Sequence, residues 1–170
     1  VGWGATDIGA RVSGILELGV GSVPGGNSSG TLVESGGGLL VATGHVDSAI
    51  IESHGYAVVS RGGSAANTTV DGGTLTVFGS ATGTTVESGG SLNVMVNYFD
   101  AGPSATVVST TVASGGTETL GSGGVDIGAT VLSGGNLVVN SGGTASGAMI
   151  SGGTLEIASG GSAQGTITFA

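Results

Sequence analysis

Residues 129–147 read ATVLSGGNLVVNSGGTASG, and this stretch decides the fold. Its short apolar runs, such as Leu137 to Val139 between Asn136 and Asn140, have the length and the alternation of a strand with one buried face. Gly-Gly pairs at 134–135 and 142–143 interrupt the runs, and glycine adopts positive φ at little steric cost. The stretch therefore predicts two strands, each followed by a tight corner, and a short third segment.

The same pattern recurs along the chain. Its anchor residue, a Val or Ile, recurs every 16 to 19 residues, with one longer step of 26 residues between Val86 and Val112. The anchors are Val33, Ile51, Val70, Val86, Val112, Val131 and Ile150. One unit cannot bury its apolar face alone, whereas stacked units bury a continuous core. We therefore expect an all-β, right-handed parallel β-solenoid of about eight coils, with 18 or 19 residues in a typical coil.

The alignment of the units predicts three inward ladders, of which the anchors form the first. The second ladder contains Leu39, Ala57, Leu75, Leu92, Leu137 and Leu155. The third contains Val41, Val59, Val77, Val94, Leu120, Val139 and Ile157. Residues 1–30 fit the pattern poorly and predict an irregular N-terminal cap or a degenerate coil. Residues 31–170 predict the repeat domain, with an insertion at about 95–107.

The composition agrees with a folded solenoid. Glycine accounts for 39 of the 170 residues, but it does not fall at every third position and there are only 2 prolines, so collagen is excluded. Disordered chains combine low hydrophobicity with high charge, whereas 38% of these residues are apolar and only 8% are charged. Because aromatic residues make up only 4%, the core must consist of small aliphatic side chains.

The net charge of the chain limits the classes of partner that it is expected to bind. With 2 basic and 11 acidic residues the net charge is -9, which disfavours nucleic acid and anionic membranes because binding either depends on Lys and Arg. No apolar stretch is long enough for a membrane helix, so we expect no membrane insertion by this segment. The absence of cysteine excludes disulfides and thiolate metal sites, and no cofactor is expected.

The pattern T-x-V-x-S-G-G-x-L-x-V-x-S-G-G-T-A-x-G, best seen from Thr130 to Gly147, resembles the passenger repeats of diffuse-adherence and self-associating autotransporter adhesins of Gram-negative bacteria. The resemblance covers about residues 31–168. It implies a surface-displayed or secreted module that mediates adhesion, self-association or biofilm formation. Its expected partners are a host or neighbouring cell surface, glycans or a second copy.

In some members of that family, a dedicated glycosyltransferase adds heptose to outward Ser or Thr. The resemblance therefore implies a glycosyltransferase as a further partner. The corner serines that match are Ser35, Ser88, Ser114, Ser133 and Ser141.

Two ladders on the predicted surface allow more than one interpretation. Glu34, Glu52 and Glu87 precede the same corner, with Asp71 close to that position. Stacked carboxylates could gather Ca²⁺, although a solvated acidic stripe is favoured. A threonine ladder precedes the anchors and is interrupted by other residues, which favours ordinary strand packing over an ice-binding surface. It contains Thr69, Thr85, Thr111 and Thr130.

Two places break the regularity. Glu118 and Asp126 align with inward Leu137 and Ala145 of the next unit. Since a buried unpaired carboxylate is costly, we expect this coil to shift its register and to turn Val125 and Ile127 inward; a metal or functional pocket is the second interpretation. The insertion carries Tyr98, Phe99 and Asp100, which either contact a partner or shield an apolar edge.

Two histidines, His45 and His54, are too few for a zinc site without further ligands. The pattern as a whole favours a non-enzymatic adhesin-like module. A carbohydrate-binding or carbohydrate-active β-helix is an alternative, and so is a subunit of an extracellular filament, because open solenoid ends expose unpaired strand edges.

Overall fold

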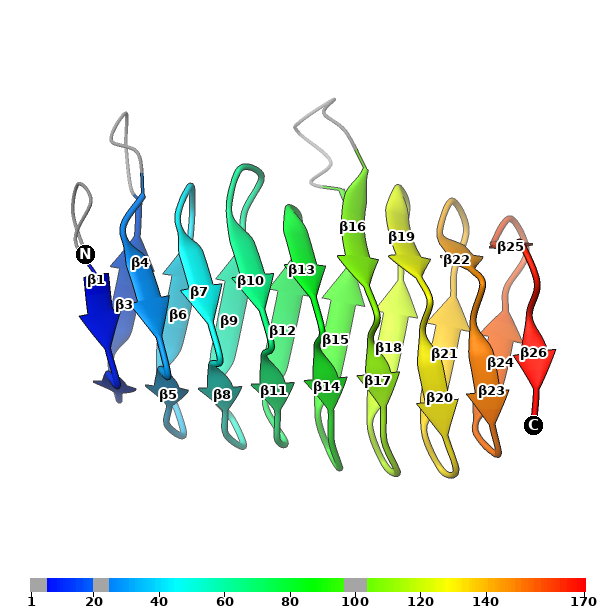
Figure 1. Cartoon of the computed structure of the whole chain (residues 1–170), viewed down its shortest axis with the longest axis horizontal. Helices are drawn as coiled ribbons and strands as arrows, with labels where there is room; N and C mark the ends of the chain where they lie inside the picture. The colour runs from blue at the N-terminus through cyan, green and yellow to red at the C-terminus, as the bar shows by residue number, and fades with distance from the viewer. Residues whose placement is uncertain (1–5, 20–24, 97–103) are drawn as a thin grey trace.

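The computed structural model describes residues 6–19, 25–96 and 104–170. Every regular element in these residues is a strand, and every strand pair is parallel, which confirms the all-β parallel solenoid. The coils stack along one axis into a rod with the N- and C-termini at opposite ends (Figure 1). The described part of the chain holds no helix long and apolar enough to cross a lipid bilayer.

Each coil passes in turn through three sheets. Sheet A consists of β1 (Thr6–Ile8), β4 (Asn27–Ser29), β7 (His45–Asp47), β10 (Ser64–Ala66), β13 (Ser80–Thr82), β16 (Ala105–Val108), β19 (Gly124–Ile127), β22 (Thr144–Ser146) and β25 (Ser162–Gln164). Sheet B consists of β2 (Arg11–Val12), β5 (Leu32–Val33), β8 (Ile50–Ile51), β11 (Thr69–Val70), β14 (Thr85–Val86), β17 (Thr111–Val112), β20 (Thr130–Leu132), β23 (Met149–Ser151) and β26 (Thr168–Phe169). Sheet C consists of β3 (Ile15–Leu18), β6 (Gly38–Val41), β9 (Tyr56–Val59), β12 (Thr74–Val77), β15 (Ser91–Val94), β18 (Thr117–Leu120), β21 (Asn136–Val139) and β24 (Thr154–Ile157).

We name the corners by the sheets that they join: A–B, B–C and C–A. At the B–C corner, Gly134 adopts φ 78°. A Cβ added to the next residue, Gly135, would lie 2.5 Å from the carbonyl oxygen of Val112 in the preceding coil. The first glycine of the pair thus reverses the chain, and the second lets two coils approach closely. His54 takes the place of the first glycine in its own coil and keeps the same left-handed conformation, with φ 64°.

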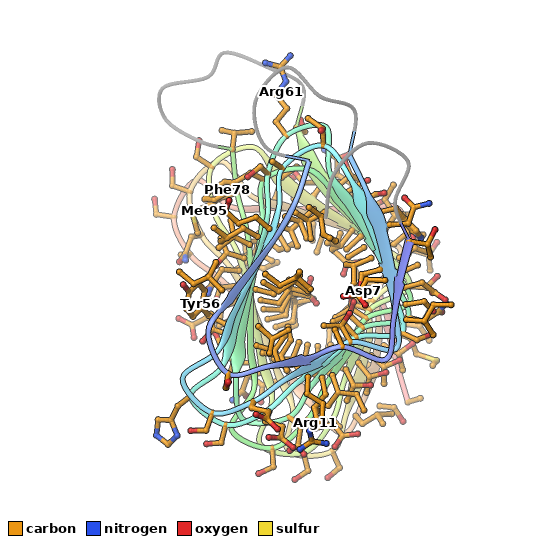
Figure 2. All side chains as sticks on the ribbon, turned by 90° about the vertical axis from the view of Figure 1, so that its left-hand side faces the viewer. Asp7, Arg11, Tyr56, Arg61, Phe78 and Met95 are labelled. Atoms are coloured by element: carbon orange, nitrogen blue, oxygen red, sulfur yellow. The ribbon has the colours of Figure 1, made fainter. Side chains whose placement is uncertain are left out.

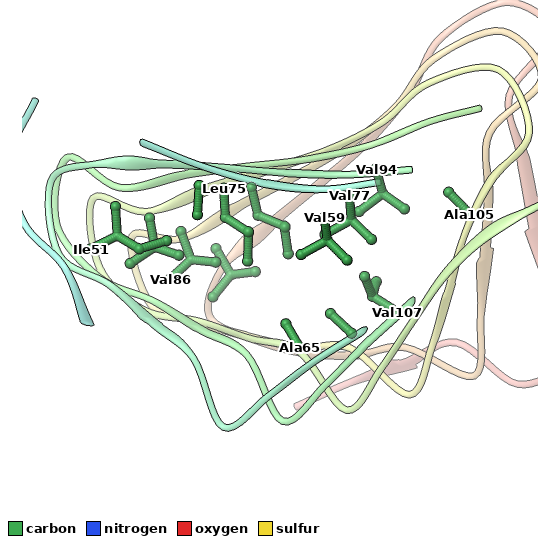
Figure 3. Close-up of a cluster of buried hydrophobic side chains, with 14 of the residues drawn as sticks. Ile51, Val59, Ala65, Leu75, Val77, Val86, Val94, Ala105 and Val107 are labelled. Atoms are coloured by element: carbon green, nitrogen blue, oxygen red, sulfur yellow. The ribbon is translucent and has the colours of Figure 1, made fainter. Parts of the chain in front are cut away.

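The core is a stack of like side chains inside the three sheets. All seven anchor residues are at most 3% exposed, which confirms the first ladder. Like side chains of successive coils lie directly above one another, as the close-up of Val59, Val77 and Val94 illustrates (Figure 3). The third ladder is buried up to Val139, and Ile157 continues it in register with Val139. That side chain is 46% exposed because β24 is the last strand of sheet C and no coil covers it.

Glu118 and Asp126 also point into the core, so the predicted register shift is wrong. Glu118 pairs with Leu92 and Leu137, Asp126 pairs with Val107 and Ala145, and both side chains are 0% exposed. The two residues that the shift would have turned inward lie outside. Val125 is half-buried and Ile127 is 47% exposed.

The N-terminal residues contain strands of the same three sheets. β1, β2 and β3 pair with β4, β5 and β6. Asp7 falls in the inward column that continues through Ser28 and Val46, and it points into the open end of the solenoid (Figure 2). At this end Ile8 and Ile15 are 80% and 64% exposed.

Candidate functional site

The B–C corner presents the same polar pair in several coils. Six of the nine strands of sheet B end on an inward Val or Ile, namely β2, β5, β8, β11, β14 and β17, and the next residue is turned outward as the chain leaves the sheet. Its backbone amide still donates to the preceding coil, as in Glu52 N to Val33 O at 2.9 Å and Glu87 N to Val70 O at 2.9 Å. The corner serine follows. We call the set Glu34, Ser35, Glu52, Ser53, Asp71, Glu87 and Ser88 the corner face.

The predicted corner serines lie where an enzyme could reach them. Ser35, Ser88, Ser114, Ser133 and Ser141 are all exposed, the first four at the B–C corner and the last at the C–A corner. Several of them lie against a glycine of the following coil. A Cβ at Gly134 would be 2.7 Å from Ser114 Oγ, and one at Gly160 would be 2.6 Å from Ser141 Oγ. The glycine therefore leaves space beside each of these hydroxyls for the coils to stack.

The structure contains the predicted acidic ladder, but the described carboxylates do not form a metal-binding cluster. Four consecutive coils contribute one carboxylate each at the corner, from Glu34, Glu52, Asp71 and Glu87. Arg11 forms an ion pair with Glu34. A shallow depression lies over the middle of the corner face, lined by Ser35, Glu52, Ser53, Asp71, Gly72, Ser88 and Gly89. Within residues 6–19, 25–96 and 104–170, no three Asp, Glu, His or Cys side chains are arranged to hold a metal ion.

A second depression, of about 270 Å³, lies at the C–A corner. It arises because the coil after β12 crosses this corner with only Phe78 and Gly79, whereas the preceding coil uses residues 60–63. Its lining includes Arg61, half-buried Phe78, Ser80 and Ser104. Phe78 points away from the core on the outer side of the rod (Figure 2). The depression thus combines an aromatic ring with hydroxyls and a guanidinium.

The other candidates are spread over the surface. The threonine ladder is in register across β11, β14, β17 and β20 and its side chains are half-buried on the outside. His45 Nδ1 lies 2.8 Å from Ser64 Oγ, and His54 Nδ1 lies 3.1 Å from Ser53 Oγ, so the two histidines occupy separate sites. Tyr98, Phe99 and Asp100 lie outside the described residues.

One outward carboxylate has a clearly perturbed acidity. Asn67 Nδ2 donates to Asp47 Oδ1 at 2.9 Å, and Ser48 Oγ donates to Asp47 Oδ2 at 3.2 Å. The hydrogen bond from Asn67 is the main cause that lowers the pKa of Asp47, because it stabilises the ionised form. Ser48 and Asn67 both adopt positive φ at the A–B corner, so these bonds tie two neighbouring corners together.

Two sets of polar residues escaped the sequence reasoning. Ser53 is an exposed corner serine in the same position as Ser35, and it was missed because His54 disrupts its Gly-Gly motif. A column of threonines is fully inside the core at the A–B corner: Thr31, Thr68, Thr84 and Thr110. The sequence did indicate that this position is inward, because the small residues Ala49, Ala129 and Ala148 occupy it in other coils.

The chain was also compared with known proteins and solved structures. No family model matches the chain, and no curated protein matches it. Among solved structures, the chain is similar to a hyper-glycosylated fragment of TibA whose glycosylation is catalysed by TibC. The identity is 31% with a TM-score of 0.81, and the match covers 96% of this chain and 69% of the other.

Proposed function

Because the chain belongs to the same family of β-solenoid adhesin repeats as TibA, we propose that it is a non-enzymatic, glycosylated module of the bacterial surface that mediates adhesion or self-association. The observation that carries the proposal is the row of exposed corner serines on a rigid rod, in a chain similar to a protein that is itself hyper-glycosylated. Display outside the cell and a glycosyltransferase partner are parts of this proposal.

The geometry supports modification at the corners. A hydroxyl that follows a strand end and precedes a left-handed glycine projects from the rod without a neighbouring side chain on its C-terminal side, as at Ser88 and Ser114. A sugar added there extends into solvent and leaves the ladder hydrogen bonds intact. By contrast Ser28 is 1% exposed and forms a hydrogen bond with Thr31, so it serves as an internal control that no enzyme reaches in the folded chain.

The test is coexpression of the chain with TibC, followed by intact mass measurement and mapping of modified peptides. We expect sugar increments at Ser35, Ser88, Ser114, Ser133 and Ser141 and none at Ser28. A variant with these five serines changed to Ala should lose most of the increments and keep its far-UV circular dichroism. An unmodified wild-type chain, or modification that persists in the variant, would contradict the proposed sites.

Adhesion is tested separately. Beads coated with the purified chain, modified and unmodified, should aggregate with one another or bind cells, whereas beads coated with an unrelated acidic protein should not. Dispersed, non-binding beads in both forms would contradict the adhesive function even if glycosylation occurs.

Carbohydrate binding is the second candidate, favoured by the depression at the C–A corner. An aromatic face beside hydroxyls is a combination that stacks on a sugar ring and hydrogen-bonds its edges. A glycan array with wild-type chain and Phe78→Ala tests this, with Tyr56→Ala as a control aromatic substitution outside the depression. A reducing-sugar assay on the same samples tests the non-enzymatic assignment, because any turnover would contradict it.

A further inference from the structure

Glu118 and Asp126 are the only titratable side chains that lie fully inside the described core. They belong to one coil, Glu118 on β18 of sheet C and Asp126 on β19 of sheet A. All four of their carboxyl oxygens are buried, and no donor of another described residue forms a hydrogen bond with them. An isolated, unpaired carboxylate in this position would strongly destabilise the fold.

Their surroundings offer no countercharge. The elements packed around the pair present only apolar side chains to it: Leu92 (β15), Val107 (β16), Val112 (β17), Val131 (β20), Leu137 (β21) and Ala145 (β22). Apart from Glu118, the polar groups that affect Asp126 are the backbone amide of Ala129 and the Thr110 hydroxyl, which is itself buried and without a hydrogen-bond partner. Within the described residues, the two carboxyls therefore face each other as the only titratable groups in this part of the core.

We propose that Glu118 and Asp126 hold a proton between them, and that loss of this proton loosens the coils on which the pair is stacked. When one carboxyl is protonated, its O–H donates to the other, ionised carboxylate, so a single proton supplies the donor that both acids lack. When the proton leaves to solvent, two negative charges remain side by side in an apolar core and repel each other.

The direction of the titration agrees with this geometry. Burial raises the pKa of Glu118 well above its ordinary range, and the charge of Asp126 raises it further. Burial also raises the pKa of Asp126, against the opposing effects of Glu118, Thr110 and the backbone amide of Ala129. Because the folded-state pKa values are raised, the stabilisation is complete below the unfolded-state pKa of an ordinary carboxyl and is lost as the pH rises through the folded-state value.

Because of where the pair lies, loss of its proton should affect one particular part of the rod. Glu118 stacks on Leu92 of β15 and Asp126 stacks on Val107 of β16, and these two strands flank the long connection between Val94 and Ala105. The insertion predicted from the sequence at about 95–107 overlaps this connection. The pair therefore acts as a pH-sensitive latch in the coil that stacks on these two strands.

Hydrogen exchange of the full chain across a pH series tests the latch. Protection factors, corrected for intrinsic exchange rates, should fall by up to about tenfold per pH unit in β18 and β19 over the range in which the folded pair still holds its proton and the opened coils have lost it, and should level off above that range, as expected for one linked proton. The same measurement in β9 and β12 should show little change. The double variant Glu118→Leu with Asp126→Ala copies the residues of the next coil, Leu137 and Ala145, and should show a flat profile in all four strands.

A second variant, Glu118→Gln, keeps the shape of the side chain and leaves Asp126 as the only buried acid, so its profile should lie between those of the wild type and the double variant. Infrared spectra should show a protonated carboxyl band in the wild type that is missing from the double variant. Equal pH profiles in wild type and double variant would overturn the proposal. So would bound Ca²⁺ in metal analysis together with protection that a chelator abolishes, because a cation rather than a proton would then hold the pair.

Discussion

Two neighbouring coils have almost the same backbone but different interiors. The coil at 129–147 buries Ala129, Val131, Leu137, Val139 and Ala145, whereas the coil at 110–128 buries Thr110, Val112, Glu118, Leu120 and Asp126. Their strands pair residue for residue, so three polar residues have replaced apolar ones without a change of register. The comparison teaches that the corners and the ladder fix the path of the chain more firmly than the polarity of single inward positions.

Gly124 shows why the register holds. A Cβ at this residue would lie 2.0 Å from the carbonyl oxygen of Val94, so only glycine fits where β19 begins. A shift of one residue would move a different residue into that space and would turn every side chain of the strand to the other face. In β18 the same shift would bury Thr119 and expose Leu120. Two protonatable acids inside are the less costly arrangement.

The largest expected effect comes from placing a lone acid in the regular coil. Val131→Asp should destabilise the fold by about 4 kcal/mol or more, because the new carboxylate has no acid beside it with which to share a proton. Thr130→Ser, on the outward face of the same strand, should change stability by less than about 0.5 kcal/mol. Chemical denaturation followed by circular dichroism measures both. Equal tolerance at the two positions would refute the assigned inward face.

The second largest expected effect comes from adding a side chain at a corner glycine where two coils approach closely. Gly124→Ala should cost about 3 kcal/mol because its Cβ forces two coils apart. Gly128→Ala is the matched control in the same coil, since its added Cβ meets nothing within 4 Å and only the left-handed conformation, φ 78°, is strained. Its expected cost is about 1 kcal/mol. If the order of the two costs were reversed, close packing at Gly124 could not be what holds the register.

The sequence was informative wherever the repeat is regular. Alternation and paired glycines predicted the coils and nearly the whole ladder of Val and Leu. The prediction for Glu118 and Asp126 was wrong because it considered the free-energy cost of burying each carboxylate alone. The structure places the two acids side by side, where they can share a proton. The same patterns also placed Ile157 on the inward ladder, but its burial depends on a following strand of sheet C. Of the site, the corner serines were predictable from the motif, whereas the C–A depression depends on unequal corner lengths that only the stacked coils bring together.

Replacing the two acids with the apolar residues of the next coil should moderately increase the stability of the fold. The double variant Glu118→Leu with Asp126→Ala should raise the stability at neutral pH by about 2 kcal/mol, as replacement of buried ionisable groups by fitting apolar ones often does. The single variant Glu118→Leu leaves Asp126 without its partner and should gain less than the double variant. Thermal unfolding of the three proteins at one pH gives the comparison, and a less stable double variant would contradict it.

The smallest effect concerns the corner where a histidine replaces glycine. His54→Gly should stabilise the chain by about 1 kcal/mol, because it relieves a non-glycine residue at φ 64°. Ser53→Ala serves as the control for the contact between Ser53 and His54 and should be nearly silent. A lower melting temperature for His54→Gly would mean that the ring contributes more than its backbone strain costs.

Thiol labelling tests the inward register of the acidic coil most directly, because the chain has no cysteine of its own. Single variants Asp126→Cys and Ile127→Cys, with Glu118→Cys and Thr119→Cys, are exposed to a thiol reagent under native conditions. The structure predicts slow labelling at 118 and 126 and rapid labelling at 127, with 119 between them. Rapid labelling at 118 and 126 together with protection at 127 would contradict the account.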